Sequence, residues 1–265
     1  MVNAGLDSIL ARRLNTFLPL SLDELNGLAG MQSPPLRLKR GTQVIHEGQT
    51  GHQAFVLQDG WACSSKRVRN GGRQIVSVAI AGDCVGLGSA QLQTADCSIE
   101  TLTDAVLNPV DPHRMLQTFG EFPRLWVALL WSLDGAFVAE RLVSIGRRSA
   151  LERMAHFFVE LAERLTSVGL ATRTEFKFPL TQYVLGDALG LSAIHVNRVL
   201  HQLRHQELLT LRQGRVQILD AGRLRKIAGL NAGKSSGATM EETLQNTFDG
   251  SRVAGGTRRH RVSKY

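Results

Sequence analysis

Three side chains of the types that read DNA bases share one side of a predicted helix. The stretch from Gly190 to Arg204 carries Ile194, Asn197 and Arg198 opposite an apolar face with helical spacing, formed by Val196, Val199, Leu200 and Leu203. An arginine can donate two hydrogen bonds to guanine, an asparagine can pair with adenine, and an apolar side chain can contact the thymine methyl group. Because the stretch contains no acidic residue, its outer side predicts a base-reading surface for the major groove. The alternative is the solvated face of an ordinary amphipathic helix.

Capping and turn residues around this stretch predict two helices joined by a tight turn. Thr181 suits the N-cap of a first helix, and Ser192 suits the N-cap of the second. Gly190 between the helices can adopt the left-handed conformation of a tight turn, and Gly186 has no side chain to hold the helices apart. The sequence therefore predicts a helix-turn-helix.

A hairpin wing and several polar side chains are expected to hold the DNA backbone. Residues 208–219 alternate in polarity around a Gln-Gly turn, which predicts the wing. Amides and hydroxyls at helix N-termini, with basic residues nearby, can bind phosphates and fix the register of the protein. We expect that role from Thr181, Gln182, Ser192, His195, His201, Arg212 and Arg215. His195 suits packing on the helix flank equally well, and Ser192 suits capping better than base reading.

The segment from Leu36 to Leu107 predicts an all-β roll or barrel. Short runs of strand-forming residues, such as "AFVL" and "QIVSVAI", lie between glycine turns at nearly regular intervals. Asp59-Gly60 and Asn70-Gly71 are strong hairpin signals. Residues 6–30 predict one or two short helices in front of the roll.

Residues 124–146 predict a long helix that is apolar on nearly all sides. Such a helix must be covered on more than one side. One side can rest on the roll, and the small residues Ser132, Gly135, Ala136 and Ala139 favour close approach of a second copy of the helix. The alternative is a helix covered on all sides within one domain. Ser149 and Glu152 then form the capping box of a new helix, and residues 146–149 are a hinge candidate between two domains.

Composition favours a cytoplasmic protein with an anionic partner. The 265 residues carry a net charge of +8, which favours nucleic acid or a membrane surface. No uncharged apolar run reaches about 18 residues, so we expect neither export nor membrane insertion. The chain also offers no pairing of nucleophile and base, no phosphate loop and no metal-ligand spacing, so we expect no enzyme, no cofactor and no metal. An odd cysteine count argues against a disulfide framework, with Cys63, Cys84 and Cys97 expected as small apolar residues and a redox sensor as the alternative.

The order of these elements resembles the CRP/FNR family of bacterial transcription regulators. The stretch "LTQYVLGDALGLSAIHVNRVL" is similar to the DNA-binding signature of that family, and the resemblance covers residues 36–229. It implies an α+β fold: a β-roll sensor domain with N-terminal helices (1–123), a dimerisation helix (124–146) and a winged helix-turn-helix (147–230). Residues 231–265 have almost no apolar periodicity, are rich in Gly, Ser and Thr and end in basic residues, which predicts a disordered basic tail. The resemblance also implies a homodimer on a palindromic operator, with RNA polymerase as a candidate partner. Arg198 falls on the family's guanine-reading arginine, whereas Ile194 stands where many members carry glutamate.

The sensory end departs from the best-known members of that family. Cyclic-nucleotide binders carry a Gly-Glu-Leu turn and then an arginine with a hydroxyl neighbour. Here Leu87 stands at the glutamate, and Ala95 and Asp96 stand at the arginine and its neighbour. Because an aspartate would repel a cyclic phosphate, we expect no response to cyclic AMP. The N-terminus also lacks the cysteine cluster of an iron–sulfur centre. The second functional hypothesis is a ligand-gated interaction module that no longer reads DNA.

Overall fold

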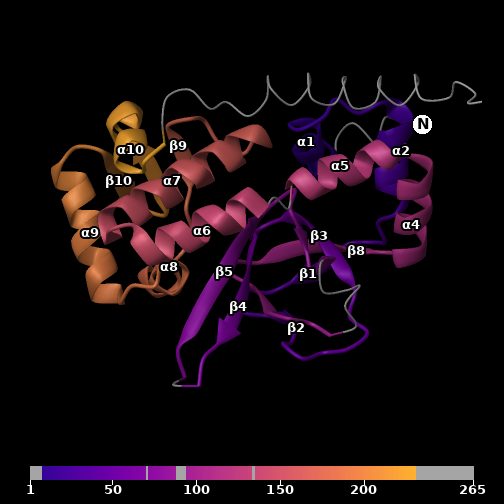
Figure 1. Ribbon diagram of the computed structural model, residues 1–265, viewed down its shortest axis with the longest axis horizontal. Helices are drawn as coiled ribbons and strands as arrows, with labels where there is room; N and C mark the ends of the chain where they lie inside the picture. The colour runs from indigo at the N-terminus through magenta and orange to yellow at the C-terminus, as the bar shows by residue number, and fades with distance from the viewer. Residues whose placement is uncertain (1–7, 70, 88–93, 133–134, 231–265) are drawn as a thin grey trace, which may run out of the picture. The chain divides into compact units, whose positions relative to one another are not determined.

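The fold begins with two short helices in front of a β-roll. The computed structural model describes residues 8–69, 71–87, 94–132 and 135–230, with only the backbone for residues 135–139 (Figure 1). The helices are α1 (Ile9–Asn15) and α2 (Leu22–Gly30). A capping box begins α2, in which the Ser21 amide donates to Glu24 Oε2 and the Glu24 amide donates to Ser21 Oγ. The short helices predicted in this region are confirmed.

Two antiparallel sheets of four strands form the roll. Their strands follow the orders β1-β8-β3-β6 and β2-β7-β4-β5. Gly60 turns the chain between two strands with a φ of 88°, where a Cβ would lie only 2.4 Å from the Asp104 carbonyl. The glycine turns thus mark strand ends as predicted. The strands are β1 (Leu36–Leu38), β2 (Gln43–Ile45), β3 (Ala54–Asp59), β4 (Trp61–Arg67), β5 (Arg73–Ile80), β6 (Cys84–Val85), β7 (Ser98–Thr101) and β8 (Ala105–Val110).

Three helices follow the roll, and the predicted long helix is described as two segments. The sequence analysis missed α4 (Pro112–Glu121), although Asp111 caps it and Pro112 occupies its first turn. The next helices are α5 (Pro123–Ser132) and α6 (Gly135–Arg147), and residues 133–134 between them lie outside the description. Ser132 Oγ donates to the Leu129 carbonyl, a local bond that competes with the helical ladder at the end of α5. The small side chains predicted for helix contact at residues 135–139 also lie outside the described part.

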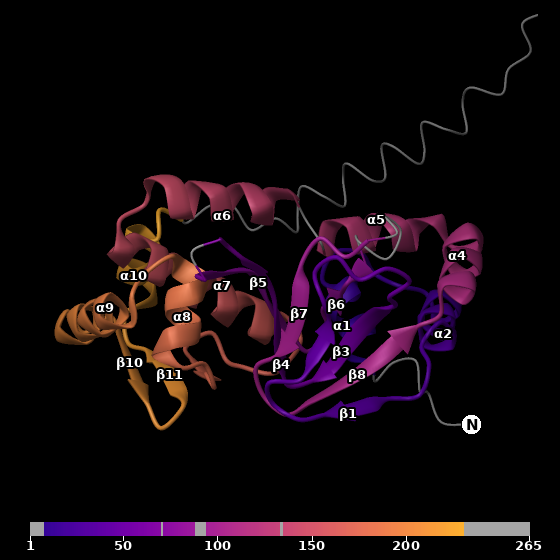
Figure 2. The ribbon, with the colours of Figure 1, turned by 90° about the horizontal axis from the view of Figure 1, so that it is seen from below.

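A C-terminal helical unit with a small sheet completes the described chain (Figure 2). The capping box of Ser149 and Glu152 begins its first helix, as predicted. The wing contains three strands in the order β10-β11-β9, one more than the sequence analysis expected. The elements are α7 (Ala150–Ser167), β9 (Glu175–Lys177), α8 (Gln182–Leu189), α9 (Ala193–His205), β10 (Leu209–Arg212), β11 (Arg215–Ile218) and α10 (Ala221–Ile227).

One apolar core joins this unit to the roll. Phe157 and Phe158 of α7 are 1% and 0% exposed, and they share a cluster with Trp61 of β4 and Ile75 of β5. A close-packed junction of this kind fixes α7 against the roll. The predicted tail at 231–265 lies outside the description. None of the helices in the described residues has the length and apolarity that crossing a membrane requires.

Candidate nucleic-acid interface

The turn between α8 and α9 has the geometry that its residues predict. Thr181 Oγ1 accepts a hydrogen bond from the Val184 amide at 3.3 Å, and Ser192 Oγ accepts one from the His195 amide at 3.2 Å. Gly190 ends α8 with a φ of 66°. At Gly186 a Cβ would lie 2.5 Å from the Leu191 carbonyl, so the two helices approach at a distance that excludes a side chain.

The two sides of α9 differ sharply in burial. Val196 and Leu203 are each 0% exposed, and Val199 lies in the same buried cluster. Ile194 on the outer side is 85% exposed, and Asn197 and Arg198 are also exposed. Leu200 is the one predicted inward residue that is only half-buried. The structure therefore brings the three predicted base-reading residues together on an open surface.

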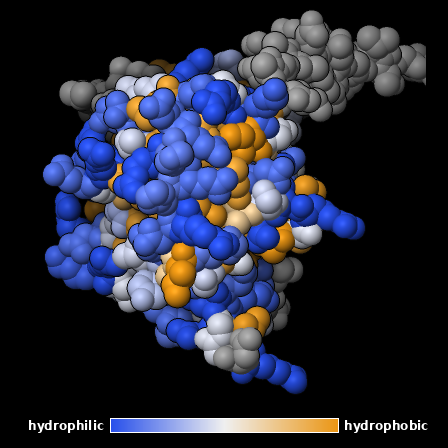
Figure 3. Space-filling model, turned by 90° about the vertical axis from the view of Figure 1, so that its left-hand side faces the viewer, coloured by the Kyte–Doolittle hydropathy of each residue, from blue (hydrophilic) through white to orange (hydrophobic). Residues whose placement is uncertain are grey.

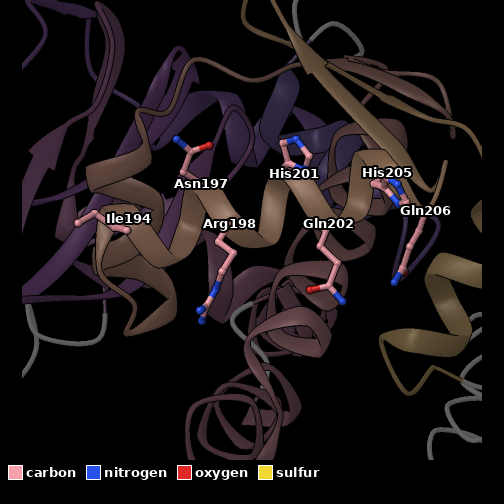
Figure 4. A pocket seen from close by; sticks show the side chains of 7 residues that line it. All are labelled: Ile194, Asn197, Arg198, His201, Gln202, His205 and Gln206. Atoms are coloured by element: carbon pink, nitrogen blue, oxygen red, sulfur yellow. The ribbon is translucent and has the colours of Figure 1, made fainter.

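A shallow hollow extends this outer side along the whole of α9. Figure 4 shows Asn197 and His201 along one edge of the helix and Arg198 and Gln202 along the other. The face of the molecule that carries α9 is largely hydrophilic (Figure 3). Sequence reasoning missed Gln202, His205 and Gln206, although the step of four residues from His201 to His205 follows from the helical period. The hollow is lined by Ile194, Asn197, Arg198, His201, Gln202, His205 and Gln206.

The predicted phosphate-binding residues differ in their exposure and in the hydrogen bonds that they already make. Gln182 is exposed in the first turn of α8, next to Tyr183, which is 76% exposed and was missed from the sequence. His195 is half-buried, in keeping with either role that the sequence allows. The hydroxyl groups of Thr181 and Ser192 already accept the capping bonds described above, and each can still donate its proton.

The wing offers one arginine to solvent and holds another in an ion pair. Arg212 is exposed at the end of β10, beside a turn in which Gln213 and Gly214 have φ values of 50° and 69°. Arg215 Nη2 lies 2.6 Å from the Glu175 carboxylate, and its Nε donates to the same oxygen at 2.8 Å. The third wing strand, which sequence reasoning missed, carries that glutamate. A phosphate contact from Arg215 would have to share the guanidinium with Glu175.

Two family models match this chain, one over each of its parts. A cyclic nucleotide-binding domain matches residues 35–121, and a Crp-like helix-turn-helix domain matches residues 152–227. The chain belongs to the CRP/FNR family. It is therefore a DNA-binding transcription regulator of the CRP/FNR type, and relatives of this kind are transcription regulators and not enzymes.

Individual CRP/FNR relatives are similar over most of their length. The nitrogen fixation regulation protein FixK of Azorhizobium caulinodans is 27% identical over 197 residues, which cover 73% of this chain and 78% of the relative. The fumarate and nitrate reduction regulatory protein of Vibrio cholerae is 22% identical over 213 residues, covering 79% and 83%. The structure of FixK2 from Bradyrhizobium japonicum shares the fold, with a TM-score of 0.65, 23% identity, and coverage of 75% of this chain and 98% of that one.

The roll of this CRP/FNR regulator is apolar at the positions where cyclic-nucleotide binders carry their glutamate and arginine. Leu87 is 7% exposed and Ala95 is 2% exposed. Ala95 packs in the core of the roll with Ile45 and Ile99. At Gly86 a Cβ would lie 2.7 Å from the Ile45 side chain, so the chain is closely packed there.

The three cysteines of the regulator are held as thiols. Burial raises the pKa of Cys63 to about 11 and that of Cys84 to about 12. Burial, with the charge of Asp96, raises the pKa of Cys97 to about 11. Only Cys63 is a fully buried core residue, as predicted, and the other two are half-buried. Because the thiolate is the reactive form, these environments disfavour redox sensing.

Proposed function

We propose that this CRP/FNR regulator binds an inverted-repeat operator as a homodimer and reads each half-site with Ile194, Asn197 and Arg198. The outer side of α9 carries the proposal, because all three side chains are exposed together on a helix without an acidic residue. A helix of this kind fits the major groove, where the three side-chain types match thymine, adenine and guanine. The complete reading face favours this function over an interaction module that has lost DNA binding.

Exposed apolar side chains on α5 and α6 support the dimer. Leu142 and Ile145 are 70% and 41% exposed, and they lie three residues apart on α6. Val143 is 47% exposed, and Leu130 on α5 is 58% exposed. Large apolar side chains exposed to water are unfavourable, so a second copy of the same helix is the expected cover.

Phosphate contacts would fix the register of each subunit on the operator. Gln182, Ser192 and Thr181 lie at the N-termini of α8 and α9, where amide groups and the helix dipole favour anions. His195 and His201 on α9, and Arg212 and Arg215 on the wing, add donors around the reading face. RNA polymerase is the proposed protein partner of the DNA-bound dimer.

Selection of bound sequences from random DNA by the purified full chain tests this function. We expect an inverted repeat whose half-site centres lie about one helical turn, roughly 34–36 Å, apart. Enrichment of a single half-site, or no enrichment, would contradict the proposal. Leu142→Glu should convert the dimer to a monomer in sedimentation, whereas the matched control Leu116→Glu, on the exposed side of α4, should remain dimeric.

We also propose that cyclic AMP is not the effector of this regulator. Ala95 is buried where a nucleotide-binding relative would present an arginine, and Asp96 beside it would repel a cyclic phosphate. Calorimetric titration with the nucleotide should show no micromolar binding. Tight binding together with a large gain in operator affinity would contradict this part of the proposal.

A further inference from the structure

Strand β5 of the roll lies along α8 of the helix-turn-helix, as both views of the ribbon show (Figures 1 and 2). The last carbonyl groups of a helix have no partner within the helix. Gln74 Nε2 of β5 donates to the Asp187 carbonyl of α8 at 2.8 Å. Arg153 Nη1 of α7 donates to the Leu189 carbonyl at 2.9 Å. The C-terminal end of α8 is therefore completed by side chains from outside the helix-turn-helix, one of them from the roll.

Arg73, the first residue of β5, joins the roll to α8 through its charge. Its Nε donates to Asp187 Oδ2 at 2.8 Å, and its Nη1 donates to Glu100 Oε2 of β7 at 2.9 Å. The side chain of Arg73 is 19% exposed and that of Asp187 is 31% exposed. Charge-assisted hydrogen bonds in such a half-buried place are stronger and more directional than an ion pair in water. One guanidinium thus connects two strands of the roll with the first helix of the DNA-binding unit.

These contacts leave the reading surface open. Ile194 is 85% exposed, and Gln182 and Tyr183 at the other end of α8 are also exposed. Only the turn at residues 190–192 separates the end of α8 from the first turn of α9. Holding the end of α8 therefore holds the beginning of α9, where Ile194, Asn197 and Arg198 lie, without covering it.

We propose that Arg73 is a positioning residue for DNA reading, through which the roll fixes the orientation of the helix-turn-helix. The proposal rests on the proposed function, because a dimer must present two reading helices at a fixed separation. A helix-turn-helix that pivots on the roll occupies the correct orientation for only part of the time. The apparent dissociation constant then rises in inverse proportion to the fraction of molecules that is correctly oriented.

Arg73→Met tests this role, since it keeps most of the apolar stem and removes both charge-assisted bonds. We expect operator affinity to fall about tenfold, as for a dimer whose two subunits are both correctly oriented one tenth of the time, with binding to a scrambled duplex unchanged. Arg67→Met is the matched control, because Arg67 is exposed directly across the β4–β5 ladder from Arg73. It should bind the operator like the wild type. Arg73→Lys, which keeps the charge, should restore part of the lost affinity.

Operator spacing distinguishes positioning from a general effect on folding. Inserting one base pair between the half-sites should weaken the wild type strongly, whereas Arg73→Met should lose less, because a pivoting domain tolerates altered spacing. Asp187→Ala should reproduce these effects, and the double variant should be no weaker than either single variant.

Several results would overturn the role of Arg73 without touching the proposed function. One is an Arg73→Met variant that binds the operator as tightly as the wild type, or more tightly, and has the same spacing penalty. Another is an Arg67→Met variant that loses as much operator affinity as Arg73→Met does. Failure of both Arg73→Met and Asp187→Ala to fold would also overturn it, by showing that the pair serves the fold. A wild-type chain that selects no inverted repeat would instead refute the proposed function.

Discussion

Gly186→Ala should destabilise the helix-turn-helix, although the same change in an open helix is stabilising. Alanine in place of glycine inside a helix gains about 1 kcal/mol when the space is free. At Gly186 the new Cβ would lie 2.5 Å from the Leu191 carbonyl, which is backbone and belongs to the tight turn before α9. The Leu191 amide also donates to the Gly186 carbonyl at 3.0 Å, so the turn cannot move independently of α8. Relieving the overlap must therefore displace the beginning of α9.

The cost of that displacement exceeds the gain in helix propensity. Forcing an extra methyl group into a packed site costs typically about 1–3 kcal/mol. We expect a net loss of about 1 kcal/mol in the free energy of unfolding, or roughly 2–4 °C in thermal midpoint for a chain of this size. Operator affinity should fall further than stability does, because the reading residues move with α9. Gly120→Ala is the control, since Gly120 in α4 has open space around its Cβ position. A Gly186→Ala variant with wild-type stability and operator affinity would refute the close approach of the helices.

Two further predictions concern groups that burial holds uncharged. Burial and the charge of Arg148 lower the pKa of His156, so its contribution to stability is complete above about pH 6.5 and is lost as the pH falls below that value. His156→Gln should therefore lose less thermal stability between pH 7.5 and 5.5 than the wild type does. An equal fall in thermal midpoint for the two proteins over this pH range would contradict the argument. Because the pKa values of Cys63, Cys84 and Cys97 are raised, iodoacetamide at pH 7.5 should modify the native thiols at least about tenfold more slowly than free cysteine. Mass spectrometry measures this modification, and rapid alkylation of any one of the three thiols in the native protein would contradict the prediction.

Local signals in the sequence were sufficient for the helix-turn-helix. Thr181 and Ser192 cap their helices, Gly190 adopts a left-handed conformation, and Gly186 permits the close approach, because each of these roles depends on residues within a few positions. The missed helix α4 had a signal of the same kind in Asp111 and the proline after it. Such features can be predicted because caps and turns are short-range.

Contacts between distant residues could not be predicted from the same signals. Strand β9 has three residues and becomes a strand only by pairing with β11, so its own sequence carries little information. The pairing of Arg73 with Asp187 joins residues 114 positions apart. Neither the spacing nor the residue types specify that contact, since both charged groups suit a solvated surface equally well. The junction of roll and DNA-binding unit is therefore visible only in the structure.

The central claim, that the outer side of α9 reads DNA bases, is tested most directly by Arg198→Ala on the selected operator. The exposed position of Arg198 means that the change opens no cavity and should leave the fold and the dimer intact. Loss of a bidentate guanine contact should cost about 1–3 kcal/mol per half-site, or roughly 2–6 kcal/mol for two independent half-sites. Arg212→Ala on the wing is the comparison, and it should weaken binding to all sequences alike and make the salt dependence shallower.

The measurement is the affinity of each variant for the operator and for a scrambled duplex at two salt concentrations. We expect Arg198→Ala to lose operator affinity selectively, so that its preference for the operator over the scrambled duplex nearly disappears. If Arg198→Ala instead weakened binding to both duplexes equally, Arg198 would be a phosphate contact and the assignment of the reading face would be wrong.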